Sequence, residues 1–233
     1  MKNSAVCNNC GNENPFYALN CKKCNSFLRS KVSNIDLWET TWRLFDSPVK
    51  AAEKIIHSDT KNFLITILFF ICIKFSLNVT IIHNAFGNRN IPFEFSSQGF
   101  VYGSLPIVIL LIVFSILITI LNKILGIGSR FRDNFSLYVY SFIPQLFGLF
   151  VLTPIQYALF GEYWFLFNPS PFIIKPMASV VLFIMEGLLF IWSSILFITS
   201  TYTQTRNKIY SVIVGLSLTL LIGFGLYLTA LIE

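Results

Sequence analysis

The sequence predicts an all-α membrane protein: a bundle of five transmembrane helices, preceded by a small N-terminal module and an amphipathic interfacial helix. Of its 233 residues, 55% are hydrophobic and only 12% are charged, whereas roughly a quarter of a soluble domain is charged. The hydrophobic residues gather in long runs after residue 61, and the polar segment before them holds a repeated cysteine pattern. The apolar excess must therefore face lipid.

Each transmembrane helix is predicted from a run of about 20 apolar residues, the length that crosses about 30 Å of hydrocarbon. Backbone groups in lipid must pair within their own segment, so each run is helical. Pro144 and Pro154 interrupt the third run, which fits a kinked span or a span followed by an interfacial, re-entrant or loop segment over 154–176. We expect the first run to be an uncleaved anchor, because no apolar stretch lies nearer the N-terminus. The runs are Asn62–His83, Leu105–Leu125, Phe135–Phe150 (or on to Phe160), Met177–Thr199 and Ile209–Ile232.

The Lys and Arg residues predict the orientation in the cytoplasmic (inner) membrane. Only Arg89 and Lys175 lie in the first-to-second and third-to-fourth connections, and most of the others lie on the opposite side. Positive residues stay cytoplasmic, so the N-terminus is predicted inside and Glu233 outside. The net charge of +6 then reports topology, and we expect no nucleic-acid partner. The predicted cytoplasmic cations are Lys2, Lys22, Lys23, Arg29, Lys31, Arg43, Lys50, Lys54, Lys61, Lys123, Arg130, Arg132, Arg206 and Lys208.

Four cysteines form the pattern C-x2-C-x10-C-x2-C: Cys7, Cys10, Cys21 and Cys24. Two C-x-x-C turns can each present two thiolates to one tetrahedral Zn²⁺. Four thiolates leave no open position, so one structural Zn²⁺ would supply the folding energy of a segment too short for its own core. Two disulfides are the alternative, but they do not persist in a reducing cytosol. Iron–sulfur ligation would need more burial. Cys72, inside the first span, is expected to be a packing residue.

The string CNNCGNENPFYALNCKKCNSFL resembles the short prokaryotic zinc-ribbon family, whose members read C-x-x-C-G-x-E-N-P before the second cysteine pair. Asn20 and Asn25 depart from that pattern without touching a ligand; a glycine often stands at the position of Asn25. The resemblance implies a fused accessory module that names no function by itself.

The segment between ribbon and first span predicts two short amphipathic helices, broken at Ser47–Pro48. Its apolar residues recur every three to four positions, and its cations lie opposite two tryptophans, which suits helices lying flat on the inner leaflet. Packing against the cytoplasmic ends of the spans is the alternative, and both can hold. The apolar positions are Ile35, Trp38, Thr41/Trp42, Phe45, Val49, Ala52 and Ile55/Ile56.

From about Leu37 onward the chain resembles the Ypt-interacting-protein (Yip) membrane-domain family in its prokaryotic branch. The resemblance rests on LWETTWRLFDSPVKAAEKII and on FRDNFSLYVYSFIPQLFGLF, where Tyr140, Ser141 and Pro144 match the family's Y-S-x-x-P in the third span. Val139 replaces a usual glycine. The resemblance implies five spans with a cytoplasmic N-terminus. We therefore expect a zinc ribbon over 1–32, interfacial linker helices over 33–61, and a Yip-like membrane domain over 62–233.

Two charges fall near mid-bilayer, Lys74 in the first span and Glu186 in the fourth, and each would cost about 2.5–3.5 kcal/mol at a span centre. We expect them to pair inside the bundle, as a structural contact or as an ion-coupling site. In the fifth span, the small residues Ser211, Gly215, Thr219 and Gly223 recur at four-residue intervals, which favours close helix packing within the chain or between two copies. Near Tyr140 and Ser141, Pro144 predicts a kink or packing notch.

No catalytic motif or pair of carboxylates at working spacing is found, so we predict a protein that is not an enzyme. The sequence favours a membrane scaffold or adaptor that meets a protein partner at the cytoplasmic face. The alternative is a small transporter or channel in which Lys74, Glu186 and Asn78 line a wet cavity.

Overall fold

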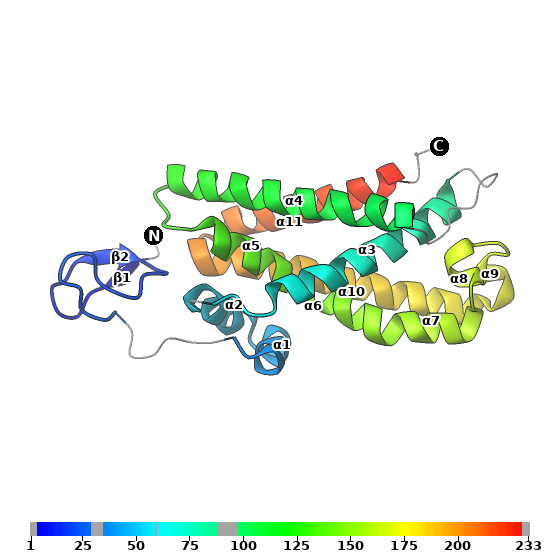
Figure 1. Ribbon diagram of the computed structural model, residues 1–233, viewed down its shortest axis with the longest axis horizontal. Helices are drawn as coiled ribbons and strands as arrows, with labels where there is room; N and C mark the ends of the chain where they lie inside the picture. Colours follow the sequence, from blue (N-terminus) through cyan, green and yellow to red (C-terminus); the bar gives the residue numbers. More distant parts are fainter. Residues whose placement is uncertain (1–3, 29–34, 59, 88–96, 230–233) are drawn as a thin grey trace. The chain divides into compact units, whose positions relative to one another are not determined.

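The computed structural model describes residues 4–28, 35–58, 60–87 and 97–229 (Figure 1). Lys2, Arg29, Lys31 and Arg89, which enter the predicted topology, lie outside these residues, as does the end of the fifth predicted span. In chain order the elements are β1 Ser4–Val6, β2 Glu13–Pro15, α1 Leu37–Asp46, α2 Pro48–His57, α3 Leu64–Phe86, α4 Ser97–Ile124, α5 Phe131–Tyr140, α6 Ile143–Phe147, the π-helix η1 Gly148–Leu152, α7 Thr153–Phe160, α8 Tyr163–Leu166, α9 Pro171–Ile174, α10 Pro176–Thr205 and α11 Lys208–Thr229.

Five helices among the described residues are long and apolar enough to cross a membrane, which confirms the predicted fold class. Many of their large apolar side chains are exposed, as expected of surfaces that contact lipid: Leu188 is 59% exposed and Leu220 is 71% exposed. The helical stretches are Leu64–Phe86, Phe100–Ile124, Phe131–Phe160, Pro176–Thr205 and Lys208–Leu228.

The third stretch is one interrupted helix that runs on to Phe160, the longer of its two predicted ends. Its α5 segment ends at Tyr140, and α6 begins at Ile143 with Pro144 in its first turn. Proline has no N–H and clashes with the preceding turn, so it cannot continue the ladder of α5. The π-helical turn Gly148–Leu152 is a second irregularity. Two short helices, α8 and α9, lie between this stretch and α10.

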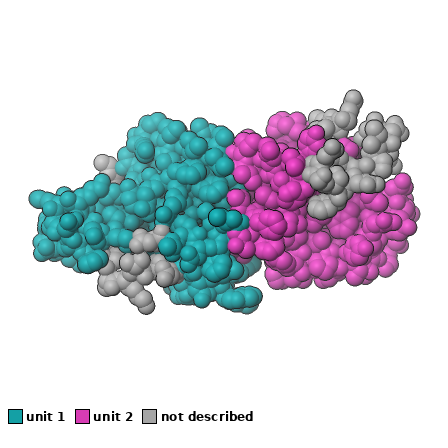
Figure 2. All heavy atoms as spheres, in the orientation of Figure 1, with its two compact units in different colours: residues 1–65, 111–141, 195–216 teal, residues 66–110, 142–194, 217–233 magenta. Residues whose placement is uncertain are grey.

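The chain divides into two units, coloured separately in Figure 2. Unit 1 consists of Met1–Ile65, Leu111–Ser141 and Ile195–Leu216. Tyr138 is fully buried in unit 1, with its ring 5.4 Å from that of Phe114 and 6.3 Å from that of Phe197. Its hydroxyl lies 3.2 Å from the hydroxyl of Thr201. The aromatic core of unit 1 therefore also satisfies its buried phenol.

Unit 2 consists of Thr66–Leu110, Phe142–Ser194 and Ser217–Glu233. Its core gathers around Trp164, which is 1% exposed and packs with Phe160, Leu152 and Ile81. Asn84 donates a hydrogen bond of 3.0 Å to the carbonyl of Phe165, which fixes α8 to α3. The aromatic segment after the third span is thus held by a buried tryptophan as well as by a polar contact.

The two amphipathic helices of unit 1 break at Ser47–Pro48, as the sequence predicts. Asp36, whose carboxylate accepts a 2.9 Å hydrogen bond from the Glu39 N–H, caps α1; Ser47 makes no such side-chain bond to α2. The inner face of α2 consists of Ala51, Ala52, Ile55 and Ile56. In α1, by contrast, Trp38 and Trp42 are 76% and 71% exposed. Of the two predicted roles, α2 thus packs within its unit, while the tryptophan face of α1 stays exposed.

Candidate metal centre and intramembrane polar site

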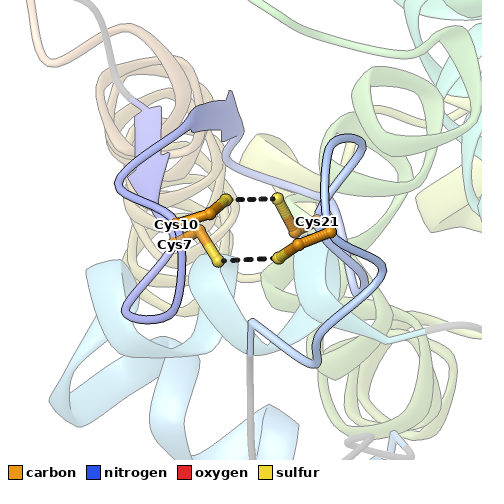
Figure 3. Close-up of side chains that lie close together, drawn as sticks. Cys7, Cys10 and Cys21 are labelled. Atoms are coloured by element: carbon orange, nitrogen blue, oxygen red, sulfur yellow. Dashed lines mark hydrogen bonds between the residues drawn. The ribbon is translucent and has the colours of Figure 1, made fainter.

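The four predicted cysteine ligands lie together in unit 1, with all four sulfurs within 4.8 Å of one another (Figure 3). Cys7 Sγ lies 3.6 Å from Cys24 Sγ, and Cys10 Sγ lies 3.5 Å from Cys21 Sγ. A tetrahedral site with Zn–S bonds of about 2.3 Å requires sulfurs about 3.8 Å apart. The cysteines are free thiols, so the disulfide alternative is not the arrangement seen. The cluster fits a metal ion held by four sulfurs.

Hydrogen bonds to the sulfurs favour the thiolates that a metal needs. The Ser26 hydroxyl lies 3.1 Å from Cys7 Sγ and 3.0 Å from Cys24 Sγ, and it lowers the pKa of both thiols. A backbone hydrogen bond from Cys24 lowers the pKa of Cys21. At Cys10, the backbone hydrogen bond from Asn12 acts in the same direction, but burial and the three neighbouring thiols outweigh it and raise the pKa to about 12. Four thiolates this close together repel one another, and a bound cation would balance their negative charge.

Two asparagines explain how the ribbon closes. Asn14 is buried, donates 2.9 Å to the Asn12 carbonyl, and accepts 3.0 Å from the Lys22 N–H, so it ties the two halves together. Asn25 has a φ of +56°. This left-handed conformation favours glycine, and asparagine is among the residues that also adopt it. The departure from the ribbon pattern at Asn25 therefore keeps the required turn.

The ribbon packs on the rest of unit 1 through three consecutive residues, Pro15, Phe16 and Tyr17. The Phe16 ring lies 4.5 Å from the His57 ring at the end of α2, and the guanidinium of Arg130 lies 4.2 Å from the centre of the Tyr17 ring. A Cβ added to Gly128 would lie 3.1 Å from Pro15 Cβ. The sequence indicates only a turn at Gly128 and a topology signal at Arg130, because the contacts of these two residues with Pro15 and Tyr17 join positions more than 100 residues apart.

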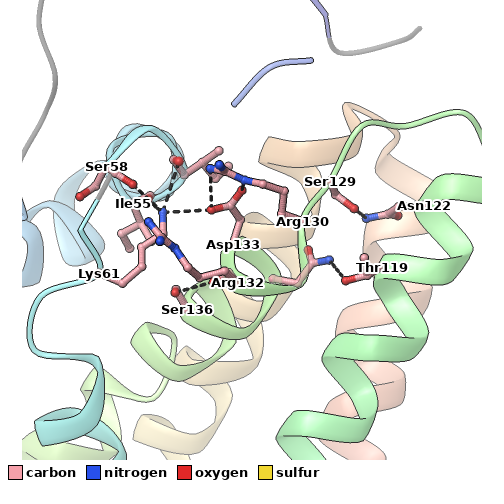
Figure 4. A network of polar contacts seen from close by, with 12 residues as sticks. Ile55, Ser58, Lys61, Thr119, Asn122, Ser129, Arg130, Arg132, Asp133 and Ser136 are labelled. Carbon is pink, nitrogen blue, oxygen red and sulfur yellow. Dashed lines mark hydrogen bonds and ion pairs between the residues drawn. The ribbon is translucent and has the colours of Figure 1, made fainter. Parts of the chain in front are cut away.

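Arg130 also belongs to a charged cluster, which we call the Asp133 cluster: Lys61, Arg130 and Asp133 (Figure 4). Arg130 donates to both Asp133 carboxylate oxygens at 2.8 and 3.2 Å, and Lys61 Nζ lies 3.1 Å from Asp133 Oδ1. Lys61 also donates to the carbonyl oxygens of Ile55, Ile56 and Ser58 at the end of α2. Burial lowers the pKa of Lys61, although the Asp133 charge opposes the shift. The cluster thus joins α2, the segment just before the first span, and α5.

In unit 2 the structure brings Lys74 and Glu186 together, with Lys74 Nζ 2.6 Å from Glu186 Oε1. The same oxygen accepts a 2.9 Å hydrogen bond from Gln156. A Cβ added to Gly148, in the π-helical turn, would lie 3.4 Å from Glu186 Oε2 and 3.5 Å from Lys74 Cε. The sequence does not reveal that Gln156 and Gly148 lie beside the Lys74–Glu186 pair, because neither residue carries a charge. Pairing reduces the cost of placing either charge in the membrane.

The remaining residues predicted to pack between helices lie in the third and fifth spans. Tyr140 donates its hydroxyl proton to the Asn62 carbonyl, and the Ser141 hydroxyl lies 3.1 Å from that of Ser200. In α11, the Ser211 hydroxyl lies 3.2 Å from that of Thr205 at the end of α10. A Cβ on Gly215 would come within 2.8 Å of the Ile198 backbone nitrogen in α10.

The later part of the same small-residue stripe is more open. Thr219 is half-buried, and a Cβ on Gly223 would meet no atom within 4 Å. Within unit 1, the first two members of the predicted stripe thus lie at a close helix contact.

The fold and these sites define a multi-pass α-helical membrane protein with an N-terminal cluster of four cysteines. A family comparison is specific: the Yip1 domain model matches residues 42–230, and the chain belongs to this family. The match begins within α1, so it takes in the second tryptophan and α2 as well as the five spans. This family is not a known enzyme family. Neither a search of curated proteins nor a search of solved structures gave a match.

Proposed function

We propose that this protein is a non-enzymatic membrane adaptor whose zinc ribbon, residues 1–32, binds a protein partner at the cytoplasmic face. The observation that carries the proposal is that the ribbon contacts the rest of unit 1 through some residues and exposes apolar side chains at others. Pro15, Phe16 and Tyr17 contact the rest of unit 1, while Phe27 and Val6 are 77% and 59% exposed. Exposed apolar side chains on so small a module are a typical feature of binding surfaces.

Zinc is the metal that the site suits best. Four sulfurs with hydrogen-bond support are typical of a structural Zn²⁺ site. The ion would hold the ribbon in the shape that exposes Phe27. The ion would have a structural role and not a catalytic one, because a closed tetrahedral site leaves no position for a substrate.

The cytoplasmic placement follows from charge. Cations on the ribbon, on α2 and on the loops before α5 and α11 would keep these segments inside, and a reducing cytosol keeps the four thiols available. The linker over 33–61 would then lie on the inner leaflet through Trp38 and Trp42, and the five-span domain over 62–233 would end outside.

Affinity purification of the full chain in mild detergent tests the proposal, with zinc measured by mass spectrometry. The variants are the double substitution Cys7→Ser/Cys10→Ser, the surface substitution Phe27→Ser and the matched control Cys72→Ser. We expect about one zinc per chain and the same co-purifying protein in the wild type and Cys72→Ser. Phe27→Ser should keep zinc but lose the partner, and the double variant should lose both. Recovery of the same proteins with every variant would overturn the adaptor role.

A further inference from the structure

Unit 2 contains a hollow of about 330 Å³ beside the Lys74–Glu186 pair. Its lining is mainly aliphatic and aromatic, with Phe183 and Phe190 among the apolar residues. Its polar members are Asn78, Gln145, Gln156, Trp164 and Glu186. An apolar hollow with a few convergent polar groups is the usual form of a site for a small molecule.

Two residues that line this hollow each carry a buried donor without a protein acceptor in the described part of the chain. Gln145 is 2% exposed and Trp164 is 1% exposed. Within the described residues, no protein acceptor lies within hydrogen-bond distance of Gln145 Nε2 or Trp164 Nε1. Buried N–H groups are nearly always paired, because leaving one unpaired is costly. Two such donors on residues of one wall are hydrogen-bonding capacity that a small movement of either side chain would offer to an acceptor-bearing molecule in the hollow.

The charge around the hollow selects against anions. Glu186 Oε1 accepts from both Lys74 and Gln156, so the single positive charge is already neutralised by the carboxylate. A phosphate or free carboxylate would meet Glu186 without a spare cation, which is unfavourable in so apolar a place. Water can pair with the five polar side chains, but it makes no favourable contact with the apolar majority of the lining.

We propose that the hollow binds the carbonyl-bearing end of a neutral amphiphile. Its carbonyl oxygens accept hydrogen bonds from Gln145 and Trp164, and its apolar body lies along the aromatic lining. The glycerol ester of a membrane acylglycerol and the ring carbonyl of a quinone share this chemistry. The site is separate from the ribbon, so the inference stands apart from the adaptor proposal.

Gly187 provides the sharpest variant. It lines the hollow, and a Cβ added there would meet no atom within 4 Å. Gly187→Leu therefore fills the hollow with little disturbance of the surrounding packing. Two further variants each remove one donor: Gln145→Leu at similar volume, and Trp164→Phe with a smaller aromatic ring. Trp192→Phe is the matched control, because Trp192 lies on the same helix as Gly187 and does not line the hollow.

Binding of dioctanoylglycerol, decylubiquinone and an anionic control, dioctanoyl phosphatidate, is measured by calorimetry on the full chain in detergent. We expect saturable binding of one neutral probe, at least tenfold weaker in Gly187→Leu and in each donor variant, and unchanged in Trp192→Phe. The probe that binds identifies the source of the carbonyl. The inference is overturned if neither neutral probe saturates, if phosphatidate binds as well, or if Gly187→Leu binds with wild-type affinity.

Discussion

Lys61 and Asp133 form an ion pair of 3.1 Å in which both side chains are almost wholly buried, at 4% and 1% exposure. The two residues are not equivalent. Asp133 also holds Arg130 through two hydrogen bonds, whereas Lys61 also donates to three carbonyl oxygens at the end of α2. The carboxylate therefore balances two cations at once, while the lysine shares its protons between one charged acceptor and several neutral ones.

This asymmetry predicts unequal losses of stability. Asp133→Asn leaves Lys61 and Arg130 facing each other without a counter-charge, and removing one partner of a buried pair costs about 3–5 kcal/mol. Lys61→Met leaves Asp133 still paired with Arg130, so the loss should be smaller. Thermal unfolding in detergent measures both, with Glu53→Gln, which breaks a more exposed pair, as a control. Equal losses for the two variants would contradict this account of the cluster.

Because the ribbon packs on the rest of unit 1, we predict that zinc stabilises the helices as well as the ribbon. Chelation should unfold residues around the cysteines and release the Phe16–His57 and Tyr17–Arg130 contacts. The melting temperature of the remaining helices should then fall by about 2–4 °C for each kcal/mol of stabilisation that docking provides. In Tyr17→Leu the effect of chelator should shrink, while in Phe27→Ser it should persist, because Phe27 is exposed. Identical chelator effects in all three proteins would show that the docking contributes nothing.

The pair in unit 2 predicts mutual rescue. Lys74→Glu and Glu186→Lys should each reduce the amount of folded protein strongly, since each brings two like charges together inside the membrane where an ion pair of 2.6 Å now stands. The doubly reversed protein should recover a large part of the yield, less the contribution of Gln156, whose N–H would then face a lysine. Monodisperse yield by size-exclusion chromatography checks this. A double variant no better than either single one would show that the pair is not formed.

How much of this could be predicted from sequence depends on the range of the interaction. The spans follow from runs of local hydrophobicity, and the four ligands follow from two short C-x-x-C turns. The break at Ser47–Pro48 is likewise local. By contrast, the burial of Asp133 or the direction of the Gln156 side chain depends on which distant helix lies opposite. Nothing in the residues around Tyr17 indicates that its ring meets Arg130.

The linker shows the same division within one segment. Apolar spacing predicts a single face shared by both helices, yet the structure buries Ala52 and Ile55 and exposes Trp38 and Trp42. Periodicity reports that a helix has two sides; it does not report which neighbour, protein or lipid, each side meets.

The intramembrane pair also has an electrical consequence. A single charge in a bilayer feels the transmembrane potential, at about 2.3 kcal/mol per elementary charge for each 100 mV. Lys74 and Glu186 lie so close that the field acts on them in opposite senses and does almost no net work. The pair therefore gives unit 2 no net charge at this depth with which to sense a change in membrane voltage.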